Sequence, residues 1–243
     1  MKHAFLAGAT KGIGFALAKQ LVDTGMHVTI TGRDAATLKA AVDRLDSPQA
    51  SGLVLDLHDH GQVRKTFASL ERIDHLVLCG SSDVAWGPFE SLSMEGLEKA
   101  LRMKLVGYLH AVQSALPLLD EHSSITFVGG TASRAAMPGT VGLAAVNGGL
   151  EAATRTLARE LAPRRVNLVS PGLTATEAYA AMPEQARTEL FEGAAARLPV
   201  GKVGAPEEIA DAIRFVMLNG FTTGSIVDVD GGAHLGYGAP LVN

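Results

Sequence analysis

A single cysteine, Cys79, occurs among the 243 residues of this sequence. No disulfide can form within the chain, so we expect a reducing compartment, the cytoplasm, as its location. The chain also lacks any charge-free stretch of the ~18 apolar residues that a membrane-spanning helix requires. Its formal net charge of −4 shows none of the positive excess that marks a nucleic-acid-binding surface. Membrane spans and nucleic-acid partners are therefore not expected.

Repeats, low-complexity segments and linkers rich in proline and glycine are also missing, while short apolar runs alternate with helical patterns throughout. Strands are predicted at 3–8, 27–32, 51–57, 74–80, 123–130, 164–172 and 224–232, and helices at 12–25, 35–46, 60–70, 93–119, 141–162 and 206–218. This order predicts an α/β fold: one doubly wound, Rossmann-type domain over residues 1–243, with about seven parallel strands and helices on both faces. The nearly continuous apolar strands agree with coverage on both faces.

Residues 173–205 interrupt this alternation between a strand and a helix. A loop of such length in a compact domain usually serves as a functional lid or a mobile segment. The segment mixes the apolar run AYAAM with charged residues such as Glu184 and Arg187. We therefore expect a lid over a partly apolar pocket for a small-molecule substrate.

The start of the chain, MKHAFLAGATKGIGFALA, has the basic residue, apolar run and small-x-small ending of a signal peptide. Lys11 interrupts that run, however, and the glycine spacing GATKGIG is better explained as a loop between a strand and a helix. Such a loop lets the backbone approach a pyrophosphate, which the free N–H groups of the following helix then bind. The alternative is a simple tight turn. The predicted cofactor contacts in the loop are Gly8, Thr10, Lys11, Gly12, Ile13 and Gly14.

Further motifs follow in a fixed order: LDL at Asp56, SPG at 170–172, VGAPEEIA at 203–210 and VDGG at 229–232. With the glycine loop, they make the chain resemble the short-chain dehydrogenase/reductase family over nearly its whole length. The resemblance implies that Asp56 and Leu57 contact the adenine and that Gly80 and Ser81 approach the adenosine ribose. It also implies that a nicotinamide segment, formed by Pro171, Gly172, Thr174 and Thr176, holds the carboxamide.

The second predicted strand ends in TGRD, which bears on the choice of cofactor. In the resembled family an acidic residue here binds the ribose 2′-hydroxyl, whereas an arginine accommodates a 2′-phosphate. Arg33 is well placed for that phosphate, and Lys11 adds positive charge. We therefore expect NADP(H) in preference to NAD(H). The alternative is that Arg33 is a solvated loop cation. The acidic residue that follows it, Asp34, directly precedes a helix and is predicted to be its N-cap.

The catalytic residues of the resembled family are not found in this chain. The resemblance implies a tyrosine, a lysine four residues later, a serine thirteen residues before the tyrosine, and an asparagine on the long preceding helix. Aligned on LAAVNGGL, these four positions hold Leu143, Asn147, Gly130 and Lys104. Leucine cannot donate a proton, and glycine offers no side chain to a substrate oxygen.

The resembled family has an asparagine on the long helix and a lysine on the helix that follows. This chain has the two residue types exchanged, with Lys104 on the first helix and Asn147 on the second. Lys104 lies beside the apolar stripe of the long helix, where a lysine needs a partner or a water. Our hypothesis is that Lys104 restores a positive charge near the nicotinamide ribose while Asn147 hydrogen-bonds that ribose; the alternative is a lysine extended to solvent. Other candidate proton donors are Thr131, Ser133, Thr140, Tyr179, His234, or a water held by Asn147 and Thr131.

These observations favour an NADP(H)-dependent oxidoreductase that acts on a small carbonyl or alcohol through a remodelled active site, with Lys104, Asn147 and Thr131 as candidate catalytic residues. The alternatives are a catalytically inactive NADP(H)-binding sensor, scaffold or partner subunit, and a non-redox reaction in the same cleft. No metal is expected, because His58–His60 reads as a turn and helix cap. Cys79 is expected to be a small buried hydrophobic residue.

The helix predicted at 141–162 begins with many small residues, which suit a close approach of backbones. The family resemblance implies that this helix and the long one before it form a dimer interface, and that the last strand adds a tetramer contact. A homodimer or homotetramer is therefore expected, unless the small residues serve packing within one subunit.

Overall fold

All seven strands predicted from the sequence are present and pair in parallel in one sheet, in the order β3-β2-β1-β4-β5-β6-β7. The structure is a computed structural model that describes residues 2–80 and 85–236. The strands are β1 (His3–Ala7), β2 (His27–Gly32), β3 (Ala50–Val54), β4 (His75–Leu78), β5 (Ser124–Val128), β6 (Arg165–Pro171) and β7 (Ile226–Val229). The predicted fold class is confirmed.

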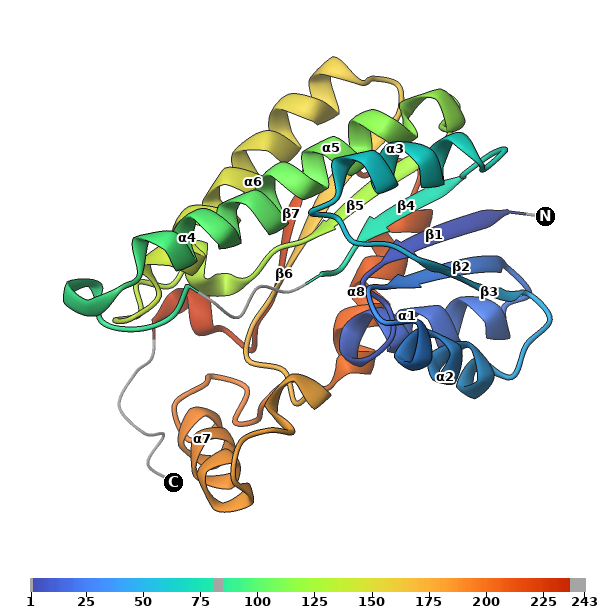
Figure 1. Cartoon of the computed structure of the whole chain (residues 1–243). Helices are drawn as coiled ribbons and strands as arrows, with labels where there is room; N and C mark the ends of the chain where they lie inside the picture. The colour runs from blue at the N-terminus through green and yellow to red at the C-terminus, as the bar shows by residue number, and fades with distance from the viewer. Residues whose placement is uncertain (1, 81–84, 237–243) are drawn as a thin grey trace.

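Helices cover both faces of the sheet (Figure 1). One face carries α1 (Gly12–Asp23), α2 (Ala35–Leu45) and α8 (Pro206–Leu218); the other carries α3 (His60–Ala68), α4 (Met94–Ala100), α5 (Gly107–Ala115) and α6 (Val141–Glu160). Leu17 and Ile213 are fully buried in the first apolar layer, and Phe67 and Leu150 in the second. In the described ranges, no helix combines the length and apolar character needed to cross a bilayer.

The long helix predicted over 93–119 is not regular. A π-helical turn, Leu101–Val106, separates α4 from α5, and a 3₁₀ turn, Leu116–Leu118, follows α5. A π turn holds an additional residue and therefore rotates the side chains that come after it. Lys104 lies inside this turn, so its direction could not be obtained from a 3.6-residue period.

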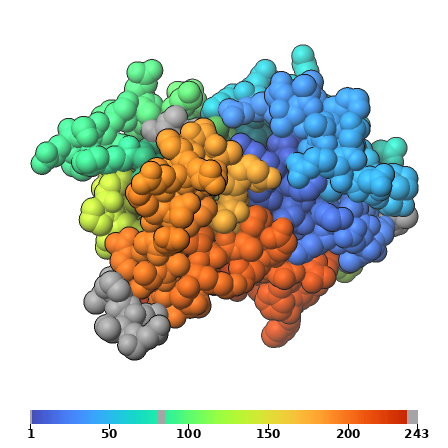
Figure 2. Space-filling model, turned by 90° about the horizontal axis from the view of Figure 1, so that it is seen from below, coloured from blue at the N-terminus to red at the C-terminus, as the bar shows by residue number. Residues whose placement is uncertain are grey.

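The segment 173–205 contains structure that its sequence pattern did not reveal. It holds a 3₁₀ turn, Glu177–Tyr179, and the helix α7 (Glu184–Ala195). The prediction of one continuous loop was wrong for these residues. Ala194 is the only buried residue of α7, so the helix has no apolar stripe that sequence periodicity could detect. In Figure 2 this segment, in orange, lies across the middle of the face, between the blue N-terminal half and the green α4 region.

The direction of the chain through the sheet changes between β1 and β4. The strands β1, β2 and β3 follow one another toward one edge, and the chain then returns to place β4 on the other side of β1. Loops that leave the carboxyl ends of two such strands diverge, which opens a crevice between them. In this chain those two loops carry the glycine loop and Gly80.

Candidate functional site

Two adjoining cavities lie at the carboxyl edge of the sheet. The first cavity, of about 250 Å³, lies between the glycine loop and the ends of β2, β3 and β4. The second cavity, of about 710 Å³, lies between the ends of β5 and β6, the start of α6 and part of the 173–205 segment. Four residues line both cavities: Ile13, Lys104, Thr176 and Ala178. The two cavities therefore form one continuous cleft.

The cofactor contacts and the catalytic candidates Lys104, Asn147 and Thr131 line this cleft, apart from Ser81, which is outside the described residues. Ser133 and His234, named as possible proton donors, line neither cavity. The first cavity is lined by Gly8, Thr10, Lys11, Gly12, Ile13, Gly14, Arg33, Asp56, Leu57, Gly80, Lys104 and Thr176. The second is lined by Lys104, Gly130, Thr131, Leu143, Asn147, Pro171, Gly172, Thr174 and Thr176. Sequence reasoning missed Thr31, Leu55, Met103, Tyr108 and Ala178 in the first cavity. Tyr108 lies four residues after Lys104, a spacing that could have indicated it.

The glycine loop leaves no room for side chains. Gly8 has a φ of +76°, and a Cβ built on it would lie 2.9 Å from the Cα and N atoms of Gly80. A Cβ on Gly14 would lie 2.7 Å from the Cα of Ala9. The backbone is thus exposed to the first cavity, as close approach of a pyrophosphate requires.

The first amide of α1 already binds an anion. The backbone N–H of Gly12 donates to Glu177 Oε2 at 2.9 Å, across 165 residues of sequence. The N-cap residue, Lys11, supplies no side-chain cap to the helix. Free N–H groups and the helix dipole make such a terminus an anion site. The residues therefore fit a pyrophosphate, and Glu177 holds one of the donors that it would use.

Positive charge gathers around the first cavity, whose lining includes Lys11, Arg33 and Lys104 and the carboxylate of Asp56. Arg33 is exposed and enters no ion pair within the described part of the chain. The neighbouring Asp34 accepts hydrogen bonds from the N–H and the hydroxyl of Thr37, at 2.7 and 2.6 Å. The N-cap predicted for Asp34 is confirmed, and these bonds lower the pKa of its carboxyl.

Asp56 is held in place by its own loop. Its Oδ1 accepts from the N–H of His58 at 3.0 Å, and its N–H donates to Gln62 Oε1 at 2.8 Å. Asp59 caps α3 by accepting from the N–H of Gln62. The turn and helix cap predicted at residues 58–60 are therefore confirmed. The ring of His60 stacks on the ring of His110, with centroids 4.2 Å apart.

Lys104 does not extend to solvent, so that alternative was wrong. Its side chain is buried, with 9% of the residue exposed, and Nζ donates to the carbonyl oxygen of Gly129 at 2.8 Å. Burial lowers the pKa of Lys104 to about 8. Burial likewise raises the pKa of the nearby Cys79 thiol to about 12, so that thiol is neutral at pH 7.

Asn147 is buried beside Gly130. Asn147 Nδ2 lies 2.9 Å from the position that a Cβ on Gly130 would occupy, and Oδ1 has no hydrogen-bond partner in the described structure. A buried, unpaired amide oxygen is costly and calls for a donor from a bound molecule. The amide thus stands where the family's serine side chain would begin.

Leu143 makes the equivalent of the tyrosine position apolar. It packs against a small cluster of Ala85, Ala100 and Val146, and it also lines the second cavity. No acid or base replaces the tyrosine at this place on α6.

Most other candidate proton donors use their hydrogen inside the protein. Thr131 donates to Asp230 at 2.8 Å, and Thr140 donates to the carbonyl oxygen of Met137 at 2.8 Å. The hydroxyl of Ser133 hydrogen-bonds with Glu151 at 2.5 Å and with the Gly130 carbonyl. Tyr179 lines the second cavity with its ring edge against Phe191.

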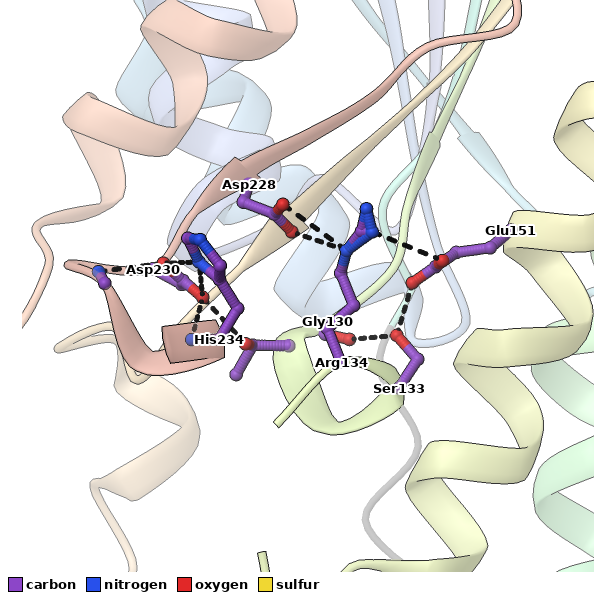
Figure 3. Close-up of polar contacts among 9 residues, drawn as sticks. Gly130, Ser133, Arg134, Glu151, Asp228, Asp230 and His234 are labelled. Atoms are coloured by element: carbon purple, nitrogen blue, oxygen red, sulfur yellow. Dashed lines mark hydrogen bonds and ion pairs between the residues drawn. The ribbon is translucent and has the colours of Figure 1, made fainter. Parts of the chain in front are cut away.

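Behind the second cavity lies a polar network (Figure 3). One carboxylate oxygen each of Asp228 and Asp230 and one ring nitrogen of His234 lie within 4.8 Å of one another. Asp228 pairs with Arg134 at 3.0 Å, and Asp230 accepts from Thr131 and twice from His234. The carboxylates are thus already engaged, and the network joins β7 to the loop after β5.

The close fit of Gly130 against Asn147 makes a testable prediction. Gly130→Ala is expected to lower the free energy of unfolding by ~1–2 kcal/mol, because its Cβ forces a buried amide to move. Urea denaturation measures this cost, which should shrink in an Asn147→Ala background. Gly193→Ala on α7 is the control, since a Cβ there meets nothing within 4 Å. Equal costs with and without Asn147 would contradict the contact.

Known proteins resemble this chain along its length. A family model described as enoyl-(acyl carrier protein) reductase matches residues 8–234. The short-chain dehydrogenase/reductase ATR9 of Stachybotrys chlorohalonatus is 31% identical over 95% of this chain and 96% of its own. A small-chain dehydrogenase solved in complex with NADPH is 34% identical, with a TM-score of 0.84, over 97% of this chain and 99% of its own. A Pseudomonas aeruginosa PAO1 short-chain oxidoreductase, described as containing an atypical catalytic center, is 29% identical, with a TM-score of 0.84, over 95% and 96%.

Proposed function

The chain belongs to the short-chain dehydrogenase/reductase family, and on this basis we propose that it is an NADP(H)-dependent oxidoreductase that acts on a small carbonyl or alcohol through a remodelled active site. One observation carries the proposal: the residues expected to contact the two ends of the dinucleotide line two cavities that join at Lys104. A protein that used the nucleotide only as a structural ligand would have no need of the nicotinamide segment.

The preference for NADP(H) over NAD(H) is supported by the charges around the first cavity. Arg33 can bind a 2′-phosphate in bidentate fashion, and Lys11 adds a second cation. The carboxylate of Asp34, the acidic residue next to Arg33, is engaged through Oδ1 as the N-cap of α2. The relative solved with NADPH supports the same choice.

Six residues of the cleft have a proposed role. A bound dihydronicotinamide supplies the hydride. Gly8, Gly12 and Gly14 leave room for the pyrophosphate, and Asn147 offers its unpaired Oδ1 to a ribose hydroxyl. Lys104 holds a positive charge at the junction of the cavities. Thr131 is a positioning residue, which fixes the loop that carries Gly130 through its bond to Asp230.

The second candidate function is a catalytically inactive NADP(H)-binding sensor, scaffold or partner subunit. The apolar surroundings of Leu143 favour it, because nothing there can replace the family's tyrosine. The relative with an atypical catalytic center supports turnover instead, since it shows that altered centres occur among related oxidoreductases.

Titration of protein fluorescence with NADPH, followed by NADPH absorbance assays with aldehydes, ketones and quinones, tests these functions. Binding with turnover supports the oxidoreductase. Tight binding without turnover over a broad panel favours the inactive protein. Failure to bind either NADP(H) or NAD(H) overturns both.

Glu177→Gln is expected to tighten NADPH binding by roughly 3- to 5-fold. The native carboxylate competes with the pyrophosphate for the N–H of Gly12, and such a charge at a helix N-terminus contributes ~1 kcal/mol. Fluorescence titration at low salt measures the change. Glu184→Gln, in the exposed first turn of α7, should leave the affinity unchanged. Weaker binding by the Glu177 variant would show that this carboxylate assists the cofactor.

We further propose that residues 173–205 are the substrate lid and that the protein is a cytoplasmic homodimer or homotetramer. The lid is supported by Thr176 and Tyr179, which line the cleft from this segment. Figure 1 shows α4 and α5 following one another in one long helix, with α6 beside it on the same face. A Cβ on Gly149 would meet Leu105 within the subunit, whereas one on Gly148 would meet nothing within 4 Å, which leaves that side of α6 open to a second copy.

A further inference from the structure

The second cavity contains few side chains that can deliver a proton to a substrate. The hydroxyl groups of Thr131, Thr140 and Thr174 donate to Asp230 and to the carbonyl oxygens of Met137 and Gly172. These aliphatic hydroxyls are also very weak acids. A reduced carbonyl nevertheless needs a proton on its oxygen. The source must therefore be one of the other groups that reach this cavity, and the two that can act as acids there are Tyr179 and Lys104.

Lys104 is such a group. Its ammonium has three hydrogens, of which one is donated to the Gly129 carbonyl oxygen at 2.8 Å. The side chain lines both cavities, at the place where the proposed nicotinamide and substrate ends of the cleft meet, and two hydrogens of the ammonium are not used by the bond to Gly129. Within the described residues no carboxylate forms an ion pair with Lys104. Its protons are thus not held by a competing base.

Two other titratable groups, Cys79 and Tyr108, line the first cavity together with Lys104. Cys79, from the end of β4, and Tyr108, from the next turn of the same helix, both have a pKa raised by burial. Asn147, from α6, is a neutral amide. The other charged groups that line the cleft are Lys11, Arg33, Asp56 and Arg197. Burial lowers the pKa of Lys104 to about 8, where a general acid works well near pH 7.

We propose that Lys104 is the proton donor of the reaction, a role that the family's tyrosine would otherwise fill. The proposal rests on the proposed oxidoreductase function and names its acid. In the reducing direction, an N–H bond of Lys104 breaks and an O–H bond forms on the carbonyl oxygen of the substrate. The hydride and its electron pair come from the dihydronicotinamide. Lys104 is left as a neutral amine, which regains a proton from water after the product leaves.

The activity test uses NADPH with an aryl ketone and a quinone as probes. We expect kcat/KM of the wild type to fall about tenfold per pH unit above pH 8, because the protonated lysine is the active form. Lys104→Met should lose ~10²- to 10⁴-fold, and methylammonium should partly rescue Lys104→Ala. Lys99→Met, on the exposed side of α4, is the matched control. If Tyr179→Phe rather than Lys104→Met abolishes turnover, the lid tyrosine is the donor and the proposal is overturned.

A second measurement needs neither cofactor nor turnover. Between pH 8 and about 10.5 the unfolded chain holds the Lys104 proton more tightly than the folded chain, so the stability of the wild type should rise with pH there. The Tm of Lys104→Met should lack this rise, and the variant should fold because it replaces a buried ammonium with an apolar side chain. Identical pH profiles of Tm would overturn the proposal. If Lys104→Met still turns over substrate, Lys104 is not the donor, but the proposed oxidoreductase function stands. If the wild type binds no NADP(H), both the role of Lys104 and the proposed function are overturned.

Discussion

Asp230→Ala is expected to lower the free energy of unfolding by ~3–5 kcal/mol, the largest loss among the substitutions considered for this chain. The Asp230 carboxylate is buried and accepts hydrogen bonds from the hydroxyl of Thr131, the N–H of Gly232, and both the N–H and the ring of His234, all at 2.8–3.0 Å. Removal of this acceptor leaves several donors unsatisfied at once. Urea denaturation at pH 7 measures the loss.

The pH dependence of this loss has a definite sign. Burial raises the pKa of the Asp230 carboxyl, but the hydrogen bonds from Thr131, His234 and two backbone amides outweigh it, and the net pKa is lowered. A lowered carboxyl pKa adds stability that is present above the unfolded value of ~3.9 and is lost as the pH falls through the folded value. The difference in the free energy of unfolding between wild type and Asp230→Ala should therefore narrow below pH 4.

Asp23→Asn is the control for these measurements. Asp23 is exposed at the end of α1, and its pair with Lys19 spans 3.7 Å. Exposed pairs of this kind contribute ~0–1 kcal/mol. A comparable loss in Asp23→Asn and Asp230→Ala would show that the network of Figure 3 adds little to stability.

Arg33→Ala should weaken NADPH binding by ~10- to 100-fold and leave NADH binding nearly unchanged. A charge-assisted hydrogen bond contributes about 1.5–3 kcal/mol, and the guanidinium of Arg33 is the group proposed to pair with the 2′-phosphate. Parallel fluorescence titrations with NADPH and NADH, at one fixed ionic strength, give both constants.

Two controls make the Arg33 result specific. Lys39→Ala removes a cation from the exposed side of α2, where it pairs with Asp43, and should not change either affinity. Arg33→Lys keeps the charge but loses the bidentate geometry, so its affinity for NADPH should be intermediate. An equal loss for NADPH and NADH in Arg33→Ala would place Arg33 against another part of the dinucleotide.

The order of strands and helices could be predicted because each of these elements is specified largely by the residues within it. Apolar runs of period 2 or 3.6 and the glycines of residues 8–14 specify strands, helices and the loop locally. The helix 206–218 was predicted to the residue. The helix α7 could not be found in this way, because it buries one residue and so has no periodic signal.

The cleft was predictable as a set of positions, but its contacts were not. The sequence indicated that Lys104 lies beside an apolar stripe, yet both the solvent-extended and the inward direction remained open. The π-helical turn and the Gly129 carbonyl decide between them, and neither leaves a mark in the local pattern. The fit of Asn147 against Gly130 likewise depends on how α6 packs on β6 and on the turn that follows β5.

The sequence by itself determined the α/β order and the glycine loop, and its alignment with the family predicts that the tyrosine, lysine, serine and asparagine are replaced. Only the tertiary structure decided which groups meet: Glu177 with Gly12 across 165 residues, and Thr131 with Asp230 across 99. The physical reason is that burial, which sets the pKa of Lys104 and the cost of the unpaired Asn147 oxygen, is produced by segments far apart in the chain.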